Sequence, residues 1–120
     1  PWLDLSLSNP AITEIDAMDP VLGIDGLKRA GRSYAGDDDH ETCMLSPING
    51  PLDKLAKVYI LTGTRDILVA DARKLKERME EQKLDIRYHE YKDMIHVWMF
   101  LNFPESKKAR KEIIRWIKQP

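Results

Sequence analysis

The sequence contains a single cysteine and no long apolar run. Because Cys43 has no second cysteine to pair with, an internal disulfide is excluded. A chain without disulfides suits a reducing compartment, so we expect a cytoplasmic protein. No stretch approaches the roughly 20 consecutive apolar residues of a membrane-spanning helix, and no signal peptide is visible. We therefore expect a protein without a membrane span.

An excess of charge of either sign is also absent. The 120 residues include 19 Lys and Arg against 20 Asp and Glu, for a net charge of −1. This balance gives no electrostatic reason to expect a nucleic acid or an anionic membrane as a partner. Hydrophobic residues make up 42% and charged residues 32%, which is typical of a globular chain. The length allows one modest domain.

The second half of the chain predicts alternating strands and helices. Residues 57–62 (KVYILT) form an apolar, β-branched run that is typical of a strand buried on both faces of a parallel sheet. Residues 85–92 predict the next strand, and residues 70–83 and 105–119 predict helices. The apolar stripe of the first helix consists of Leu68, Ala72, Leu75 and Met79, and that of the second of Ala109, Ile113, Trp116 and Ile117. We therefore expect an α/β fold with parallel strands and a right-handed crossover.

The first half predicts less regular structure. Residues 1–8 have the pattern of a strand end that runs into a loop. Thr13 is placed to cap a short helix, and Asp19, followed by proline, is the clearest helix start in the chain. Residues 36–51 are polar and rich in turn-forming residues, so we expect a long ordered loop there.

Two polar residues follow the two predicted strands. Asp66 lies just beyond the strand at 57–62, and His96 just beyond the strand at 85–92. Functional loops lie beyond the carboxyl ends of parallel strands, so we expect the two side chains to be within hydrogen-bond reach. A carboxylate on one imidazole nitrogen fixes the tautomer and stabilises the imidazolium that forms when the other nitrogen takes a proton. The pair therefore predicts two members of a Ser-His-Asp triad, in the chain order Ser, Asp, His.

Each of the two residues has a structural alternative. Asp66 alone would be interpreted as a turn or capping aspartate before the helix that follows it. His96 alone would be interpreted as a packing histidine, because its neighbours are apolar. Those neighbours are Met94, Ile95, Val97, Trp98, Met99 and Phe100. The placement of both residues after consecutive strands favours the catalytic interpretation.

The serine of such a triad is missing in its usual context, a G-x-S-x-G turn between a strand and a helix. Residues 31–35 (GRSYA) come close, and Ser33, Asp66 and His96 would fall in the right order. However, a predicted helix precedes Ser33 and an acidic loop follows it, so we interpret Ser33 as a residue at a helix end.

Five segments carry more specific motifs. They are residues 1–5 (PWLDL), 45–50 (LSPING), 62–68 (TGTRDIL), 71–72 (DA) and 94–97 (MIHV). Together they resemble successive signatures of the hormone-sensitive-lipase-like family of α/β-hydrolases, the group of bacterial carboxylesterases, acetyl esterases and lipases.

This resemblance implies that residues 1–120 are the C-terminal part of an α/β-hydrolase domain. A loop and helical segment at about 9–50 would precede a βαβα unit at 57–119. The resemblance also implies that Asp66 and His96 are triad members, and that the nucleophile elbow and a His-Gly-Gly oxyanion motif lie upstream. Because the chain begins with proline rather than methionine, we expect a truncated product.

The leading hypothesis is therefore a serine carboxylesterase that acts on a small ester without a metal or an organic cofactor. We expect an apolar substrate pocket near the site, shaped by Ile67, Ile95, Val97 and Trp98. Because a fold does not determine a function, two alternatives remain. One is a non-catalytic member of the same fold that binds a small ligand, and the other is a free-standing small α/β binding domain.

The remaining candidate residues favour structural roles. The acidic run at 37–41 (DDDHE) lacks the spacing of a calcium loop, so we expect it to be solvated. We expect His89 to be structural and Cys43 to be buried or half-buried. The two helices of the second half are expected to cover one face of the sheet. The other face and an unpaired strand edge would then recruit a second copy or the missing N-terminal part.

Overall fold

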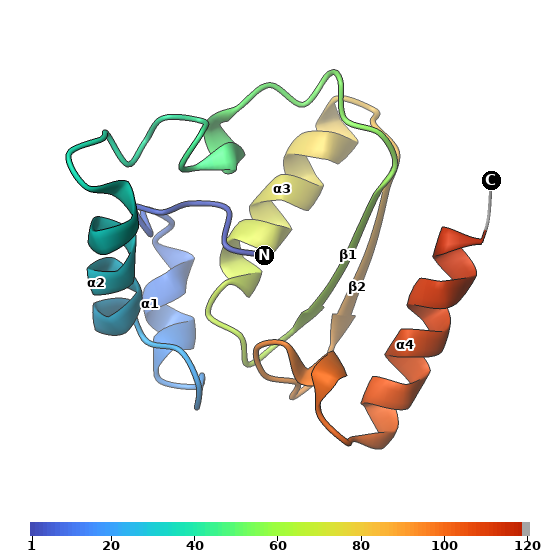
Figure 1. Cartoon of the computed structure of the whole chain (residues 1–120). Helices are drawn as coiled ribbons and strands as arrows, with labels where there is room; N and C mark the ends of the chain where they lie inside the picture. Colours follow the sequence, from blue (N-terminus) through green and yellow to red (C-terminus); the bar gives the residue numbers. More distant parts are fainter. Residues whose placement is uncertain (119–120) are drawn as a thin grey trace.

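The computed structural model describes residues 1–118 as a pair of parallel strands with helices around them (Figure 1). Its elements are α1 (Ala11–Asp16), α2 (Ile24–Ala35), the 3₁₀ turn η1 (Pro47–Asn49), β1 (Val58–Gly63), α3 (Val69–Glu81), β2 (Ile86–Tyr91), the 3₁₀ turn η2 (Trp98–Phe100) and α4 (Pro104–Ile117). None of the helices in this part of the chain combines the length and the apolarity that a membrane crossing requires.

Both strands and both helices predicted for the second half are present, and the α/β fold class is confirmed. β1 and β2 pair in parallel, with Val58 opposite Ile86 and Gly63 opposite Tyr91. The predicted end of the last helix at Gln119 lies outside the described residues. Because the strands are parallel and in register, their carboxyl ends meet at one edge of the sheet.

The helix α3 covers one face of the sheet. Its stripe of Ala72, Leu75 and Met79 packs with Ile60 of β1 in a buried apolar cluster. A step of three or four residues keeps these side chains on one side of the helix, whereas alternate residues of a strand share one face. The predicted stripe on this helix is confirmed, since Leu68 is buried as well.

The helix α4 lies on the opposite side of the sheet (Figure 1). Its Trp116 ring lies 4.8 Å from the ring of Tyr59 in β1. The expectation that both helices cover the same face is therefore wrong, because the chain crosses the sheet edge at η2 before α4 begins. The predicted buried stripe of α4 is only partly buried: Ala109 is fully covered, whereas Ile117 is 78% exposed.

Predictions for the first half were less accurate. Residues 1–8 form a turn instead of a strand end, because the buried Asp4 carboxylate accepts the backbone N–H groups of Ser6 (2.9 Å) and Ser8 (2.8 Å). Burial alone would raise the pKa of Asp4, but the hydrogen bonds from these two serines outweigh it and lower the pKa. Thr13 lies inside α1, after Pro10 at the cap position.

The structure contradicts the predictions for Asp19 and Cys43 and agrees with the prediction for Ser33. Asp19 does not begin a helix, since α2 starts at Ile24. Cys43 is exposed rather than buried. Ser33 lies on α2 and is exposed, and the preceding element α1 is a helix rather than the strand that a nucleophile elbow requires.

Candidate active site

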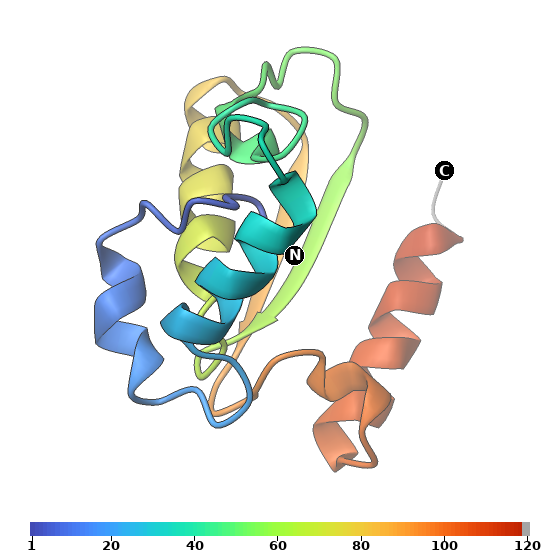
Figure 2. The same ribbon diagram turned by 60° about the vertical axis from the view of Figure 1, so that its left-hand side comes forward.

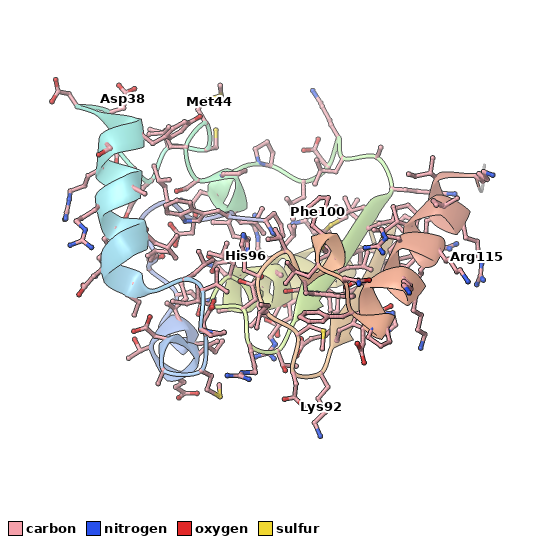
Figure 3. The ribbon with its side chains drawn as sticks, turned by 60° about the horizontal axis from the view of Figure 1, so that its bottom comes forward. Asp38, Met44, Lys92, His96, Phe100 and Arg115 are labelled. Atoms are coloured by element: carbon pink, nitrogen blue, oxygen red, sulfur yellow. The ribbon has the colours of Figure 1, made fainter. Side chains whose placement is uncertain are left out.

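The carboxyl ends of β1 and β2 bring Asp66 and His96 together. Asp66 follows β1 by three residues and His96 follows β2 by five. The Asp66 Oδ2 atom lies 3.0 Å from His96 Nδ1, so the predicted contact is confirmed. Figure 3 shows His96 between the α2 side of the molecule and α4. When Nδ1 carries the proton, it donates this hydrogen bond to the carboxylate.

Asp66 is held by the turn that leads into α3. Its Oδ1 atom accepts the N–H of Leu68 at 3.0 Å, and its backbone N–H donates to the carbonyl of Gly63 at 3.2 Å. With Oδ1 occupied in this way, Oδ2 is the oxygen directed at His96. Asp66 is thus a turn aspartate and the partner of the histidine at once, so the two interpretations do not compete. The residue is 6% exposed.

The loop that carries His96 is bound to the loop that carries Asp66. The carbonyl of Met94 accepts the N–H of Arg65 at 3.0 Å, and the N–H of Asp93 donates to Thr64 Oγ1 at 2.8 Å. The Met94 carbonyl also packs directly against Gly63, where any side chain would overlap it. Sequence reasoning did not identify this role of Gly63, although a glycine at a strand end is its usual signal.

The exposed part of the histidine determines what the pair can do. A quarter of its side chain (25%) is exposed, against 8% for Asp66. Within residues 1–118 the second ring nitrogen, Nε2, has no hydrogen-bond partner. An imidazole with a carboxylate at Nδ1 and an open Nε2 can accept a proton from a nucleophile and return it to a leaving group.

The four residues predicted to shape a substrate pocket fall into two groups. Ile67 (0% exposed) and Trp98 (1% exposed) pack in the interior, where they contact other core residues and cannot reach a substrate. Ile67 is correspondingly part of the apolar cluster around α1, and Trp98 packs with Tyr91. Ile95 is half-buried and Val97 is 44% exposed, so these two can still line a pocket beside His96.

The helix α4 supports the histidine loop from behind. Ser106 Oγ donates to the carbonyl of Trp98 at 2.7 Å, two residues after His96. The Trp98 ring lies 4.4 Å from that of Tyr91, whose hydroxyl donates to Glu112 at 2.7 Å. Burial and this hydrogen bond raise the pKa of the Tyr91 phenol. Sequence reasoning missed Ser106 and Glu112, because they look like ordinary polar residues of an amphipathic helix.

His89 contacts Glu112 and Tyr91, in agreement with a structural role. Its Nδ1 lies 3.1 Å from Glu112 Oε1, and its ring stacks on Tyr91 at 4.3 Å. Burial alone would raise the pKa of Glu112, but the hydrogen bonds from Tyr91 and His89 outweigh it and lower the pKa. In the part of the chain that the structure describes, no three His, Cys, Asp or Glu side chains gather into a metal-binding group.

Comparisons with known proteins identify the fold family of this chain. The sequence model of the alpha/beta hydrolase fold matches residues 1–100. The chain is 28% identical to an acetyl-hydrolase of Streptomyces hygroscopicus over 111 residues, which cover 91% of this chain and 37% of that protein. It is also 28% identical to an esterase of Acinetobacter venetianus over 116 residues, which cover 94% of this chain and 38% of that protein.

The structure is similar to a solved esterase from the bacterial hormone-sensitive lipase family. The TM-score is 0.93 at 26% sequence identity, and the match covers 98% of this chain and 40% of that one. The chain thus spans about two fifths of the length of the relatives that it matches. The chain belongs to the α/β-hydrolase fold family, and its resemblance to the hormone-sensitive-lipase-like members is confirmed.

Proposed function

We propose that this chain supplies the base and the acid of a Ser-His-Asp triad in a carboxylic-ester hydrolase. The observation that carries the proposal is the 3.0 Å contact between Asp66 Oδ2 and His96 Nδ1 at the carboxyl edge of the sheet, with no described residue bonded to Nε2. The names of the two relatives, acetyl-hydrolase and esterase, support the same class of reaction. The nucleophilic serine would come from outside these 120 residues.

In this reaction His96 Nε2 takes the serine proton while the serine oxygen attacks the ester carbonyl. The proton then passes to the departing alcohol, and an acyl-serine remains. Water repeats the sequence, with His96 as base again, and releases the carboxylic acid. Asp66 keeps the proton on Nδ1 and stabilises the imidazolium. No metal or organic cofactor takes part in these steps.

We propose a small, uncharged ester as the substrate. Ile95 and Val97 flank His96 and present apolar surface beside it. A carbonyl that reaches Nε2 would therefore have an apolar acyl or alcohol group next to these side chains. This arrangement favours short ester groups over charged ones.

The 120-residue chain alone is expected to hydrolyse p-nitrophenyl acetate no faster than the background reaction, because it lacks an activated serine. A polypeptide that joins this chain to a nucleophile elbow and an oxyanion hole is expected to hydrolyse it. The measurement is release of p-nitrophenolate by each protein. Turnover by the chain alone that Ser33→Ala abolishes would contradict the proposal, because Ser33 would then be the nucleophile.

We further propose that the outer edge of β1 binds another strand. In residues 1–118 the sheet has two strands, so β1 has a neighbour on one side only. Figure 2 looks onto this edge, with α3 and α4 on either side of it. An apolar hollow of about 370 Å³ on the α3 side is lined by residues such as Leu3 and Leu75, and one of about 320 Å³ on the α4 side by Leu61 and Trp116. The side chains of an added strand alternate between faces and would enter both hollows.

The isolated chain is therefore expected to associate with itself through this edge. Light scattering across a concentration series should show a mass that rises above 13.9 kDa. Successive N–H groups of a strand point to opposite sides. Val58 N and Thr64 N, at even positions, donate to carbonyls on the β2 side, so the N–H of Leu61, at an odd position, points to the outer edge of β1. Leu61→Pro removes this outward donor and should keep the chain monomeric. A concentration-independent monomer before substitution would contradict the proposal, as would association that Leu61→Pro leaves unchanged.

A further inference from the structure

The corner between α1 and α2 is bound to both neighbours of Asp66. Arg65 Nε donates to the carbonyl of Met18 at 3.1 Å. The backbone N–H of Ile67 donates to Asp19 Oδ2 at 2.8 Å. Residues 65 and 67 are thus both attached to adjacent residues that lie almost fifty positions earlier in the chain.

The carboxylate of Asp19 joins two segments because its two oxygens accept hydrogen bonds from different parts of the chain. Oδ1 accepts the N–H groups of Val21 (2.8 Å) and Leu22 (3.0 Å) and closes the corner itself. Oδ2 accepts the N–H of Ile67 and so reaches the loop after β1. Ile67 is fully buried, and its backbone donor could not turn to water if this acceptor were lost.

The direction of the Asp66 side chain depends on this backbone. The bond from the Leu68 N–H to Asp66 Oδ1 forms only when residues 66–68 keep their turn, and this bond leaves Oδ2 for His96. The N–H of Ile67 lies at the centre of that turn. A change of backbone angle at Ile67 would move the Leu68 N–H and so break the bond that fixes the Asp66 carboxylate.

We propose that Asp19 is a positioning residue for the Asp66–His96 pair, acting through its hydrogen bond to the Ile67 N–H. The effect of Asp19 on the geometry of the pair does not depend on the proposed function. Only its consequence for catalysis rests on that proposal. A carboxylate suits the position because it has two acceptor oxygens, and both are in use. An asparagine has one acceptor oxygen and cannot serve the corner and Ile67 together.

The test is NMR of the 120-residue chain with ¹⁵N-labelled histidine. In the unaltered chain the His96 Nδ1–H is expected as a downfield proton resonance that exchanges slowly with water, and Asp66→Asn should remove it. In Asp19→Asn its exchange is expected to accelerate on the order of tenfold, the ratio that accompanies loss of one ordinary hydrogen bond. The His40 signals should not change, because that residue lies outside the network.

The matched control is Asp16→Asn. Asp16 Oδ1 accepts the N–H of Ile24 at 2.9 Å, so it stabilises the same region without contacting the loop of Asp66. This variant should leave the His96 resonance unchanged. An Asp19→Asn chain that keeps its fold by circular dichroism and exchanges the His96 Nδ1–H at the original rate would overturn the inference.

A second variant decides the matter if Asp19→Asn does not fold. Asp19→Ser keeps one acceptor oxygen for the N–H groups of Val21 and Leu22 but has no second oxygen to reach the N–H of Ile67. Faster exchange of the His96 Nδ1–H in this variant would support the role proposed for Asp19, and an unchanged rate would overturn it. Because the NMR measurement requires no hydrolysis, this inference and the proposed esterase reaction can fail separately.

Discussion

His96→Ala is expected to lower kcat for ester hydrolysis on the order of 10⁵-fold, in a polypeptide that joins this chain to a nucleophile elbow and an oxyanion hole. Without the imidazole nothing takes the proton from the serine, and nothing returns a proton to the leaving alcohol. The substrate still binds through groups that the substitution does not alter, so KM should change little. Initial rates with p-nitrophenyl acetate over a range of substrate concentrations measure both parameters.

The matched control for this variant is His89→Ala. His89 belongs to the preceding strand and pairs with Glu112 at 3.1 Å, away from Asp66. Its removal should lower stability modestly and leave kcat within a small factor of the original value. If His96→Ala retained most of the activity, His96 would not be the base and the proposed triad would be wrong.

Gly63→Ala is expected to disrupt both the fold and the site. A Cβ at this position would lie 2.9 Å from the Met94 Cβ and would overlap the Met94 carbonyl. That carbonyl cannot move aside easily, because it accepts the N–H of Arg65 at 3.0 Å. Overpacking of this kind typically costs about 1–3 kcal/mol of unfolding free energy, and we expect a value at the upper end because backbone meets backbone. Urea denaturation measures the loss.

The loss should be accompanied by separation of Asp66 and His96. Gly63 lies where the two strand-end loops touch, so the loop of His96 must move to make room for a methyl group. Gly26→Ala is the matched control, because its Cβ would meet nothing within 4 Å and the residue lies inside α2. That substitution should raise the unfolding free energy by about 0.4–1 kcal/mol. Equal stability of the two variants would contradict the close approach at Gly63.

The position of the candidate site on the sheet was predictable from side-chain spacing along single elements and from the order of those elements. The apolar run at 57–62 and the stripe of α3 each follow from side-chain spacing along one element. Once a strand, a helix and a second strand follow one another, parallel pairing brings their carboxyl ends together. Asp66 and His96 stand just after those ends, so their contact follows from the order of the elements alone.

The partners that hold this pair were not predictable, because they depend on contacts between distant segments. Asp19 has the sequence pattern of a helix start, and only the folded chain places its carboxylate against the N–H of Ile67. The face of the sheet that α4 covers was also not predictable, because an amphipathic helix fits either face. Its course is decided by Trp98, which is buried with Tyr91 and Ala109 at the turn between β2 and α4.

By itself, then, the sequence determined which residues form the strands and helices, and that a carboxylate and an imidazole meet at one edge of the sheet. These properties depend on the period of side chains along single elements and on the order of those elements. Only the tertiary structure decided that Ile67 and Trp98 are core residues rather than pocket residues, and that Asp19, Gly63 and Ser106 hold the site. Burial and hydrogen bonding between segments far apart in the chain depend on packing in three dimensions, and no local pattern of residues encodes them.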